Sequence, residues 1–271
     1  MSKGVVVFAF KNEKIDYVSQ AKFLAQRVTK FLNLPTTIVT DENIKNNVFD
    51  KVILLEKPNR QIKKFTNFQE SENLTWYNCA RHHSYDITPY EKTLVLDSDY
   101  VISNDLLLNC FETDDIMMYS NNTIFLNNPK PMHNYFSNTG PKMYWATCLY
   151  FAKNKESEIF FNLTKHILEN YKFYSLIYDF SDSPIRNDFI FSIATHMFNN
   201  LNKGTFVKDC PGKHYILDAN DLLLDINDDM ISYLAFDSYN DLHKPVVSKG
   251  LSVHVMNKYS FDKFIAGTDN G

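Results

Sequence analysis

The sequence is short of several residues and motifs that mark common protein classes. Its 271 residues include only 7 glycines, and none of the patterns GxSxG, GxxxxGK[ST], GxGxxG or HExxH occurs. The usual serine hydrolase, P-loop, dinucleotide-binding and zincin classes are therefore excluded. The net charge of −4 and the pI near 6.1 give no global reason to bind a polyanion. Arginine is also rare, so each one is a candidate anion partner: Arg27, Arg60, Arg81 and Arg186.

Cysteines and long apolar runs are equally sparse. Cys79, Cys110, Cys148 and Cys210 lie far apart without metal-ligand spacing, which predicts free buried thiols in a reducing compartment. No segment approaches the ~20 apolar residues that span a bilayer, and the N-terminus carries no apolar stretch long enough for a signal peptide. We therefore expect a cytoplasmic protein without a membrane span.

Short apolar runs alternate with helical patterns along the chain. With 44% hydrophobic residues and no repeat or linker, residues 1–271 are expected to form one domain. The alternation predicts an α/β fold with a mostly parallel, Rossmann-like central sheet flanked by helices, followed by a more mixed second half. Strands are expected at 4–10, 36–42, 51–56, 115–120, 143–153 and 251–256, with one more within 93–102 that ends at two carboxylates, and helices at 16–32, 71–86, 156–171, 187–200 and the C-terminal tail.

Two carboxylates follow one of these apolar strands. The stretch TLVLDSDYVI (93–102) delivers Asp97 and Asp99 to the carboxyl end of the strand, where open α/β sheets bind ligands. In an extended exit, residues i and i+2 point the same way, so the two anions converge and repel each other unless a cation lies between them. A divalent metal with oxygen ligands satisfies this arrangement. The alternative is that both residues only cap the next turn.

The longer stretch TPYEKTLVLDSDYVI (88–102) resembles the strand and DxD signature of GT-A glycosyltransferases. The resemblance implies a GT-A fold, a nucleotide-sugar donor and a metal ion, Mn²⁺ or Mg²⁺. It also implies that the first half of the domain, about residues 1–103, binds the nucleotide and that the second half, about residues 104–271, binds the acceptor. It implies that Asp99 ligates the metal directly and that Asp97 is its partner.

A second element lies near the C-terminus. The stretch LSVHVMNKYSF (251–261) resembles the His…Lys element of glycogenin-like and galactosyltransferase-like enzymes, which implies that His254 is a third metal ligand and that Lys258 neutralises the leaving diphosphate. The family's spacing is not kept, because its glycine is absent and the lysine is closer. The alternative for His254 is a satisfied core residue.

The resemblance also implies a set of donor-binding positions. The first strand and its exit occupy the place of the base and ribose, Tyr17 is a candidate to stack on the base, and Asp41 resembles the acidic residue near uracil or ribose. Arg81, with Asn78 one turn earlier, lies where related enzymes place a basic residue on ribose or phosphate. The donor positions are Phe8, Ala9, Phe10, Lys11, Tyr17, Asp41, Asn78, Arg81, Asp97, Ser98 and Lys258.

The second half offers one more acidic candidate. SPIRNDFIF (183–191) places Asp188 where the family has an acidic residue facing the transferred sugar or acceptor; with Lys258 it forms the catalytic pair. The alternative is a helix N-cap. Thr147 and Cys148 stand where relatives often carry Asn-Ala-Gly, which leaves the sugar identity open.

The predicted function is metal-dependent transfer of a sugar from a nucleotide-sugar, by resemblance a UDP-sugar, to a hydroxyl. Asn, Lys, Tyr and Phe are abundant, as in proteins encoded by AT-rich genomes. This composition, together with the stretch LVLDSDY, resembles that of bacteriophage enzymes. The first acceptor considered is therefore 5-hydroxymethylcytosine in phage DNA, in the host cytoplasm, with 57–65 (KPNRQIKKF) as the basic surface. A surface polysaccharide or lipopolysaccharide glycan is the alternative acceptor, and a non-catalytic nucleotide-sugar-binding protein is the alternative class. Residues 121–142 are expected to form a long loop near the acceptor.

Overall fold

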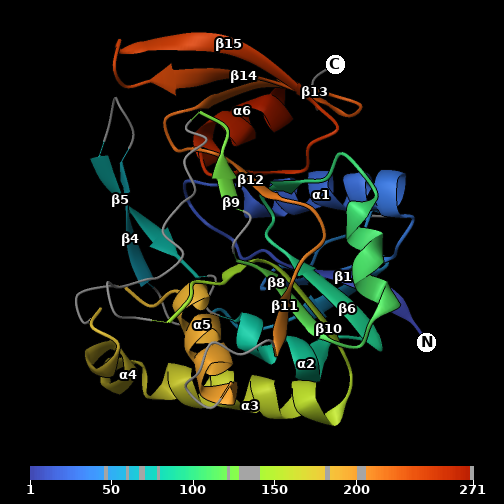
Figure 1. Cartoon of the computed structure of the whole chain (residues 1–271). Helices are drawn as coiled ribbons and strands as arrows, with labels where there is room; N and C mark the ends of the chain where they lie inside the picture. Colours follow the sequence, from blue (N-terminus) through green and yellow to red (C-terminus); the bar gives the residue numbers. More distant parts are fainter. Residues whose placement is uncertain are drawn as a thin grey trace.

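A seven-stranded sheet forms the centre of the protein (Figure 1). The computed structural model describes residues 1–45, 48–58, 61–66, 71–77, 80–120, 123–127, 141–180, 184–199 and 206–268. In this large sheet, β10 runs antiparallel to β6 and β8, and every other neighbouring pair is parallel. The predicted α/β class with a mostly parallel sheet is confirmed. In sheet order the strands are β11 (Val207–Asp209), β8 (Ile116–Tyr119), β10 (Trp145–Ala152), β6 (Lys92–Leu96), β1 (Lys3–Phe8), β2 (Thr36–Thr40) and β3 (Lys51–Leu54).

Helices cover both faces of the large sheet, which is why its central strands are apolar throughout. Val5, Val6 and Val7 of β1 are fully buried, as expected for a parallel strand between two helical layers. In Figure 1, α1 and α6 lie on one side of the sheet, and α2, α3 and α5 on the other. The bounds are α1 (Tyr17–Leu32), α2 (Ser84–Ile87), α3 (Lys155–Glu169), α4 (Tyr171–Ile177), α5 (Asn187–Phe198), α6 (Lys258–Thr268) and the 3₁₀ segments Arg81–His83 and Leu106–Glu112.

A small four-stranded sheet packs against α6 and has its own core. Its order is β7-β16-β12-β9, with bounds β7 (Tyr100–Val101), β16 (Val253–Val255), β12 (His214–Leu217) and β9 (Thr123–Phe125). Phe261 of α6 is fully buried in this core and meets Phe23 of α1 edge to face at 5.6 Å. An antiparallel meander covers the same core from outside (Figure 1): β13 (Leu222–Asn227), β14 (Met230–Asp237) and β15 (Leu242–Lys249).

The chain passes from the large sheet to the small one through the two predicted carboxylates. β6 ends at Leu96, and residues 97–99 form a turn in which Tyr100 N–H donates to the Asp97 carbonyl at 3.1 Å. β7 then pairs antiparallel with β16, with Tyr100 opposite His254. The strand predicted to end at the two carboxylates is β6, and the chain changes sheets inside the motif. Asp97 follows the large sheet and Asp99 precedes the small one.

The helix predicted over 71–86 is wrong in its first part and confirmed from Arg81 on. Residues Ser71–Trp76 form β5, which pairs with β4 (Gln61–Thr66) in an antiparallel hairpin, and helical structure begins only at Arg81. Ser, Asn, Thr and Trp are weak helix formers, so pairing with β4 decides the outcome. Asn78 and Cys79 lie outside the described residues.

Other expectations can be compared directly. Cys110, Cys148 and Cys210 are buried free thiols, as predicted. Among the described residues, no helix is long and apolar enough to cross a membrane. Of the loop predicted at 121–142, the structure describes 123–127 and 141–142, and β9 lies within the first of these.

Candidate active site

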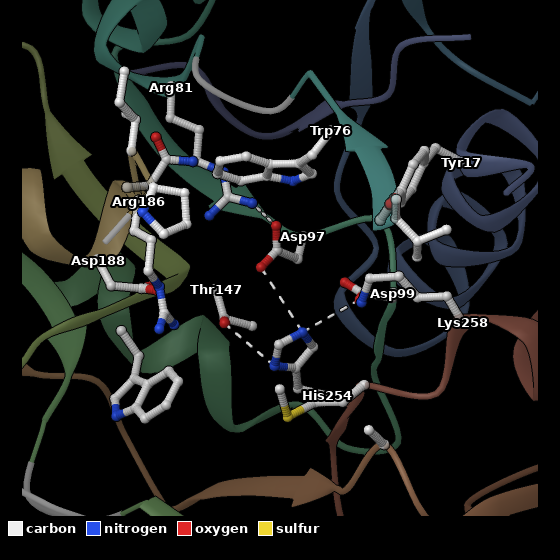
Figure 2. Close-up of a pocket in the computed structure, with 18 of the residues that line it drawn as sticks. Tyr17, Trp76, Arg81, Asp97, Asp99, Thr147, Arg186, Asp188, His254 and Lys258 are labelled. Atoms are coloured by element: carbon white, nitrogen blue, oxygen red, sulfur yellow. Dashed lines mark hydrogen bonds and ion pairs between the residues drawn. The ribbon is translucent and has the colours of Figure 1, made fainter. Parts of the chain in front are cut away.

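A cavity of about 500 Å³ lies where the carboxyl end of β6 meets the small sheet (Figure 2). We call Asp97, Asp99, Thr147 and His254 the floor of this cavity, because strands of the two sheets carry them or adjoin them. We call the hairpin residues Leu74, Thr75 and Trp76 its wall. Residues 184–188, before and at the start of α5, line a further side.

The three predicted metal ligands meet on the floor. Asp97, Asp99 and His254 each offer one ligand atom, and these atoms all lie within 4.8 Å of one another. His254 Nε2 lies 3.3 Å from Asp99 Oδ2 and 4.0 Å from Asp97 Oδ2. Pairing of β7 with β16 sets this convergence, since it brings His254 beside the residue that follows Asp99. Two carboxylates and an imidazole can hold one divalent cation.

Two cations neutralise the carboxylates from either side. The Arg81 guanidinium pairs with Asp97 Oδ1 and also donates to the Ala146 carbonyl, and its side chain is buried. Lys258 Nζ donates to Asp99 Oδ2. Burial by itself raises the pKa of Asp99, but the charges of Lys258 and His254 outweigh it, so the pKa of this carboxyl lies well below its usual range. Asp99 is therefore ionised at neutral pH.

Lys258 is held in place by the start of α6. The Asn257 side chain accepts the Ser260 backbone N–H at 3.1 Å and donates to the Asp221 carbonyl at 3.0 Å. This cap puts Lys258 in the first turn of the helix, with its side chain directed to the floor (Figure 2).

His254 is enclosed by groups from both sheets. Its Nδ1 lies 3.4 Å from Thr147 Oγ1 of β10, and its ring stacks on His214 of β12 with centroids 5.7 Å apart and planes 12° apart. His214 is fully buried, and burial lowers its pKa well below the usual range, so its ring is neutral. Both nitrogens of His254 thus have polar neighbours, with Nδ1 facing Thr147 and Nε2 facing the two carboxylates on the floor.

Asp188 lies across the cavity from Lys258 (Figure 2). Its Oδ1 accepts the Ala146 N–H at 2.9 Å and its Oδ2 accepts a guanidinium N–H of Arg186 at 3.0 Å. The cap position of α5 is Arg186, which makes no side-chain capping bond. Asp188 therefore ties α5 to β10, and the N-cap alternative does not describe its contacts.

The predicted base-binding residues fall into two groups. Phe8, Phe10, Tyr17 and Ser98 line a small cavity together with Trp76 and Tyr77, and Tyr17, Trp76 and Ser98 also line the main cavity. Ala9 N–H donates to the Val39 carbonyl, so its backbone continues the sheet contacts of β1. Burial, followed by the charges of Asp99 and Asp262, raises the pKa of Tyr17, which is therefore neutral.

Lys11 and Asp41 lie together but line neither cavity. Asp41 Oδ1 accepts the Lys11 backbone N–H at 2.7 Å, and its Oδ2 pairs with Lys57 at 3.2 Å. Lys57 belongs to the predicted basic segment 57–65, of which residues 59 and 60 lie outside the described part. Since Lys57 is neutralised by Asp41, it adds no free charge to a basic surface.

Both tryptophans of the sequence line the cavity, and sequence reasoning did not select either. Trp76 lies on the wall, and Trp145 begins β10 next to the floor. Their rarity was the available signal, because the chain has only 2 tryptophans and 15% aromatic residues. Exposed aromatic faces in a cavity suit the flat side of a base or a sugar ring.

No protein family model and no curated protein matches the chain. Among solved structures, it is similar to the glycosyltransferase GlyE of Streptococcus pneumoniae TIGR4, with 15% identity over 77% of this chain and a TM-score of 0.40. It spans only 45% of the length of GlyE. It is also similar to the galactosyltransferase LgtC in complex with donor and acceptor sugar analogs, with 14% identity, a TM-score of 0.45, and coverage of 76% of this chain and 72% of LgtC. At such identities and TM-scores, function has to be inferred from the chain's own site.

Proposed function

We propose that the protein is a metal-dependent glycosyltransferase that moves a sugar from a nucleoside diphosphate to an acceptor hydroxyl. The observation that carries this proposal is the cluster of Asp97, Asp99 and His254, with Lys258 against it, on the floor of a cavity of about 500 Å³. Two acidic oxygens and a cation in one concave site suit a metal–diphosphate ligand.

The donor atoms fit Mn²⁺, with Mg²⁺ as the alternative. Asp97 and Asp99 supply the hard oxygens that both ions accept, and His254 supplies an imidazole nitrogen, which favours Mn²⁺. A bound ion of this kind supplies positive charge that stabilises a departing diphosphate. The three residues would hold it between them, while Arg81 keeps Asp97 oriented through Oδ1.

Lys258 is the residue proposed to meet the leaving group. Its ammonium already lies against Asp99, and in a complex a diphosphate oxygen would share its three donors. Negative charge grows on that oxygen as the sugar–phosphate bond breaks, so a fixed cation there stabilises the transition state. Asp188, on the opposite side, has a lone pair left on each oxygen and would accept hydroxyl groups of the sugar or acceptor.

The nucleobase is proposed to lie in the main cavity against Tyr17 and Trp76. Both residues also line the small cavity with Phe8, Phe10 and Tyr77, but its volume of about 20 Å³ has room for about one water molecule. Aromatic faces at this position suit a flat base, and the resemblance to UDP-sugar enzymes makes uracil the first candidate. Lys11 and Asp41 line neither cavity: the Lys11 ammonium pairs with Glu42, and Asp41 accepts the Lys11 backbone N–H and pairs with Lys57.

The acceptor is proposed to carry its hydroxyl on or next to a ring that packs against Trp76 or Trp145. A hydroxymethylated base extruded from DNA and a sugar of a surface glycan both meet this requirement. The assay offers hydroxymethylated DNA and an oligosaccharide together with radiolabelled UDP-sugars. Label in DNA supports the modified base as acceptor. Label only in the oligosaccharide overturns it in favour of the glycan.

Calorimetry with UDP tests the proposed site against a non-catalytic nucleotide-binding role. UDP binding to the wild-type chain is expected to strengthen at least tenfold when Mn²⁺ is added, which is about 1.4 kcal/mol. The Asp99→Ala variant is expected to lose that gain. If the variant keeps Mn²⁺-dependent UDP binding, the carboxylates are not the metal site and the proposal fails.

A further inference from the structure

His254 reaches the floor from a short strand, and its ring needs support from outside that strand. β16 has three residues, Val253–Val255, and the side chain of its middle residue is 10% exposed at the cavity. An imidazole can turn about its side-chain bonds and can carry its proton on either nitrogen. To act as a metal ligand through Nε2, it needs its proton on Nδ1 and its plane directed at Asp97 and Asp99.

Thr147 addresses the first requirement. Its hydroxyl lies 3.4 Å from His254 Nδ1, and the side chain is buried on β10 of the large sheet. When Nε2, the nitrogen that faces the carboxylates, binds a metal, the ring proton lies on Nδ1, and the Thr147 hydroxyl oxygen is placed to accept it. Thr147 therefore supplies the hydrogen-bond acceptor that the metal-binding tautomer requires.

His214 addresses the second requirement. Its ring lies parallel to the His254 ring at 5.7 Å, and Tyr119 stacks on its other face at 4.9 Å with planes 5° apart. Thr123 Oγ1, 3.3 Å from His214 Nδ1, anchors the middle ring. Three nearly parallel rings, two of them on neighbouring strands of the small sheet, fix the plane of the outermost one.

The identity of His214 is unusual for a packing residue. It is fully buried, and within the described part of the chain its Nε2 has no hydrogen-bond partner. A buried polar atom without a partner lowers stability, which a phenylalanine at this position would avoid. His214→Phe therefore keeps the stacking ring without that cost, and it serves as the matched control below.

We propose that Thr147 and His214 are positioning residues that hold the His254 ring with Nε2 facing Asp97 and Asp99 as a metal ligand. This inference rests on the metal site of the proposed function. It assigns a role to Thr147 different from the sugar contact predicted from its sequence position. It also explains why one ligand is secured jointly by β10 of the large sheet and β12 of the small sheet.

The test measures Mn²⁺ alone, without substrate, by calorimetry and by the nitrogen coupling of bound Mn²⁺ in pulsed electron paramagnetic resonance. Thr147→Val keeps the shape and removes the hydroxyl, whereas Thr147→Ser keeps the hydroxyl and is the matched control. Thr147→Val is expected to bind Mn²⁺ about 10- to 100-fold more weakly, with the nitrogen coupling reduced or lost. Thr147→Ser is expected to retain both affinity and coupling.

His214 is tested by the same measurements with a second pair. His214→Leu removes the flat ring and is expected to weaken Mn²⁺ binding about tenfold, while His214→Phe keeps a stacking ring and is expected to stay near wild type. Equal Mn²⁺ affinity and coupling in Thr147→Val, His214→Leu and wild type would overturn the inference while leaving the metal site intact. A wild-type chain that binds no Mn²⁺ would overturn the proposed function itself. Should His214→Leu fail to fold, the threonine pair decides.

Discussion

The floor and the wall of the cavity are built in different ways. The floor residues lie on or beside strands of two sheets, and Asp99, Thr147 and His254 are all buried. The wall belongs to the two-stranded hairpin of β4 and β5, which is not hydrogen-bonded into the large sheet or the small sheet. Its contacts to the rest of the chain include the Asn12 side chain, which donates to the Thr75 carbonyl at 2.8 Å, and Glu72, which accepts from Lys14 and Tyr259.

This difference suggests that the floor serves metal binding and catalysis, whereas the wall serves substrate affinity. A two-stranded hairpin is marginal on its own, so the position of the wall depends on a few polar contacts at its surface. The floor instead inherits the rigidity of two packed cores. We therefore expect changes on the floor to abolish metal binding and transfer, and changes on the wall to alter substrate affinity with the chemistry intact.

The largest effect is expected on the floor itself. Asp99→Asn removes the charge that both Lys258 and His254 face, so sugar transfer should fall about 10²- to 10³-fold. The measurement is turnover of UDP-sugar at saturating Mn²⁺. Asp225→Asn, at an exposed position of β13, is the matched control and should behave as wild type. Equal turnover in the two variants would contradict the assignment of the floor.

The next effect concerns the core beneath the floor. Phe261→Ala should lower the free energy of unfolding by about 3–5 kcal/mol, because the ring is fully buried between α6, α1 and the small sheet. Phe191→Ala, in the larger core, should lower it by a similar amount. Only Phe261→Ala is expected also to weaken Mn²⁺ binding, since the small sheet carries His254. Denaturant unfolding and Mn²⁺ calorimetry on both variants check this, and identical Mn²⁺ affinities would show that the two sheets support the site equally.

A smaller effect is expected on the wall. Trp76→Ala should raise the KM for donor or acceptor roughly tenfold with kcat little changed, because a stacking face is lost and no charge is disturbed. Steady-state kinetics with each substrate varied in turn give the two parameters. A fall in kcat as large as that of Asp99→Asn would erase the distinction between wall and floor.

The smallest effect should come from the contact that holds the wall. Hydrogen bonds from Lys14 and then Tyr259 lower the pKa of Glu72. A carboxyl whose pKa is lowered by folding stabilises the fold above its ordinary pKa and loses that contribution as the pH falls through the lowered value. Glu72→Gln should therefore shift Trp76 fluorescence near neutral pH, and the shift should begin to shrink below about pH 4 and vanish once the pH is below the lowered pKa.

Trp145→Phe provides the background for that measurement, because it leaves Trp76 as the remaining tryptophan. Trp76 fluorescence is then compared between the protein with Glu72 and the Glu72→Gln variant. If the two differ by the same amount at every pH, the charge of Glu72 does not hold the hairpin.

Local sequence predicted those parts of the fold whose structure is decided locally. The valine run of β1 and the helical periodicity of α1 gave their elements within a few residues, because a fully buried strand and an amphipathic helix each have a distinct pattern. The DxD motif drew attention to Asp97 and Asp99 for the same reason. β5 could not be predicted, since its six pairs with β4 outweigh weak local preferences.

The site residues that escaped prediction depend on contacts between distant segments. Arg81 was predicted as a donor-binding residue and lines the cavity, but its pairing with Asp97, 16 positions later in the chain, had no signal in the sequence. His214 had no motif around it and acquires its place from pairing between β12 and β16. The meander β13–β15 was missed as well, although Asp228 and Asp241, both with left-handed backbones at φ 50° and 49°, mark its turns.

The turn at residues 97–99 also fixes the number of residues between β6 of the large sheet and β7 of the small sheet. β7 is two residues long and pairs Tyr100 with His254 and Val101 with Val253. One residue inserted beside Ser98 would slide that register by one and exchange the faces of β7, turning Asp99 away from His254 and Tyr100 out of the core. The small replacement Ser98→Ala should thus keep the fold of this turn, whereas an insertion or a deletion should not. The spacing of Asp97 and Asp99 therefore fixes how the large and the small sheet are joined at the cavity.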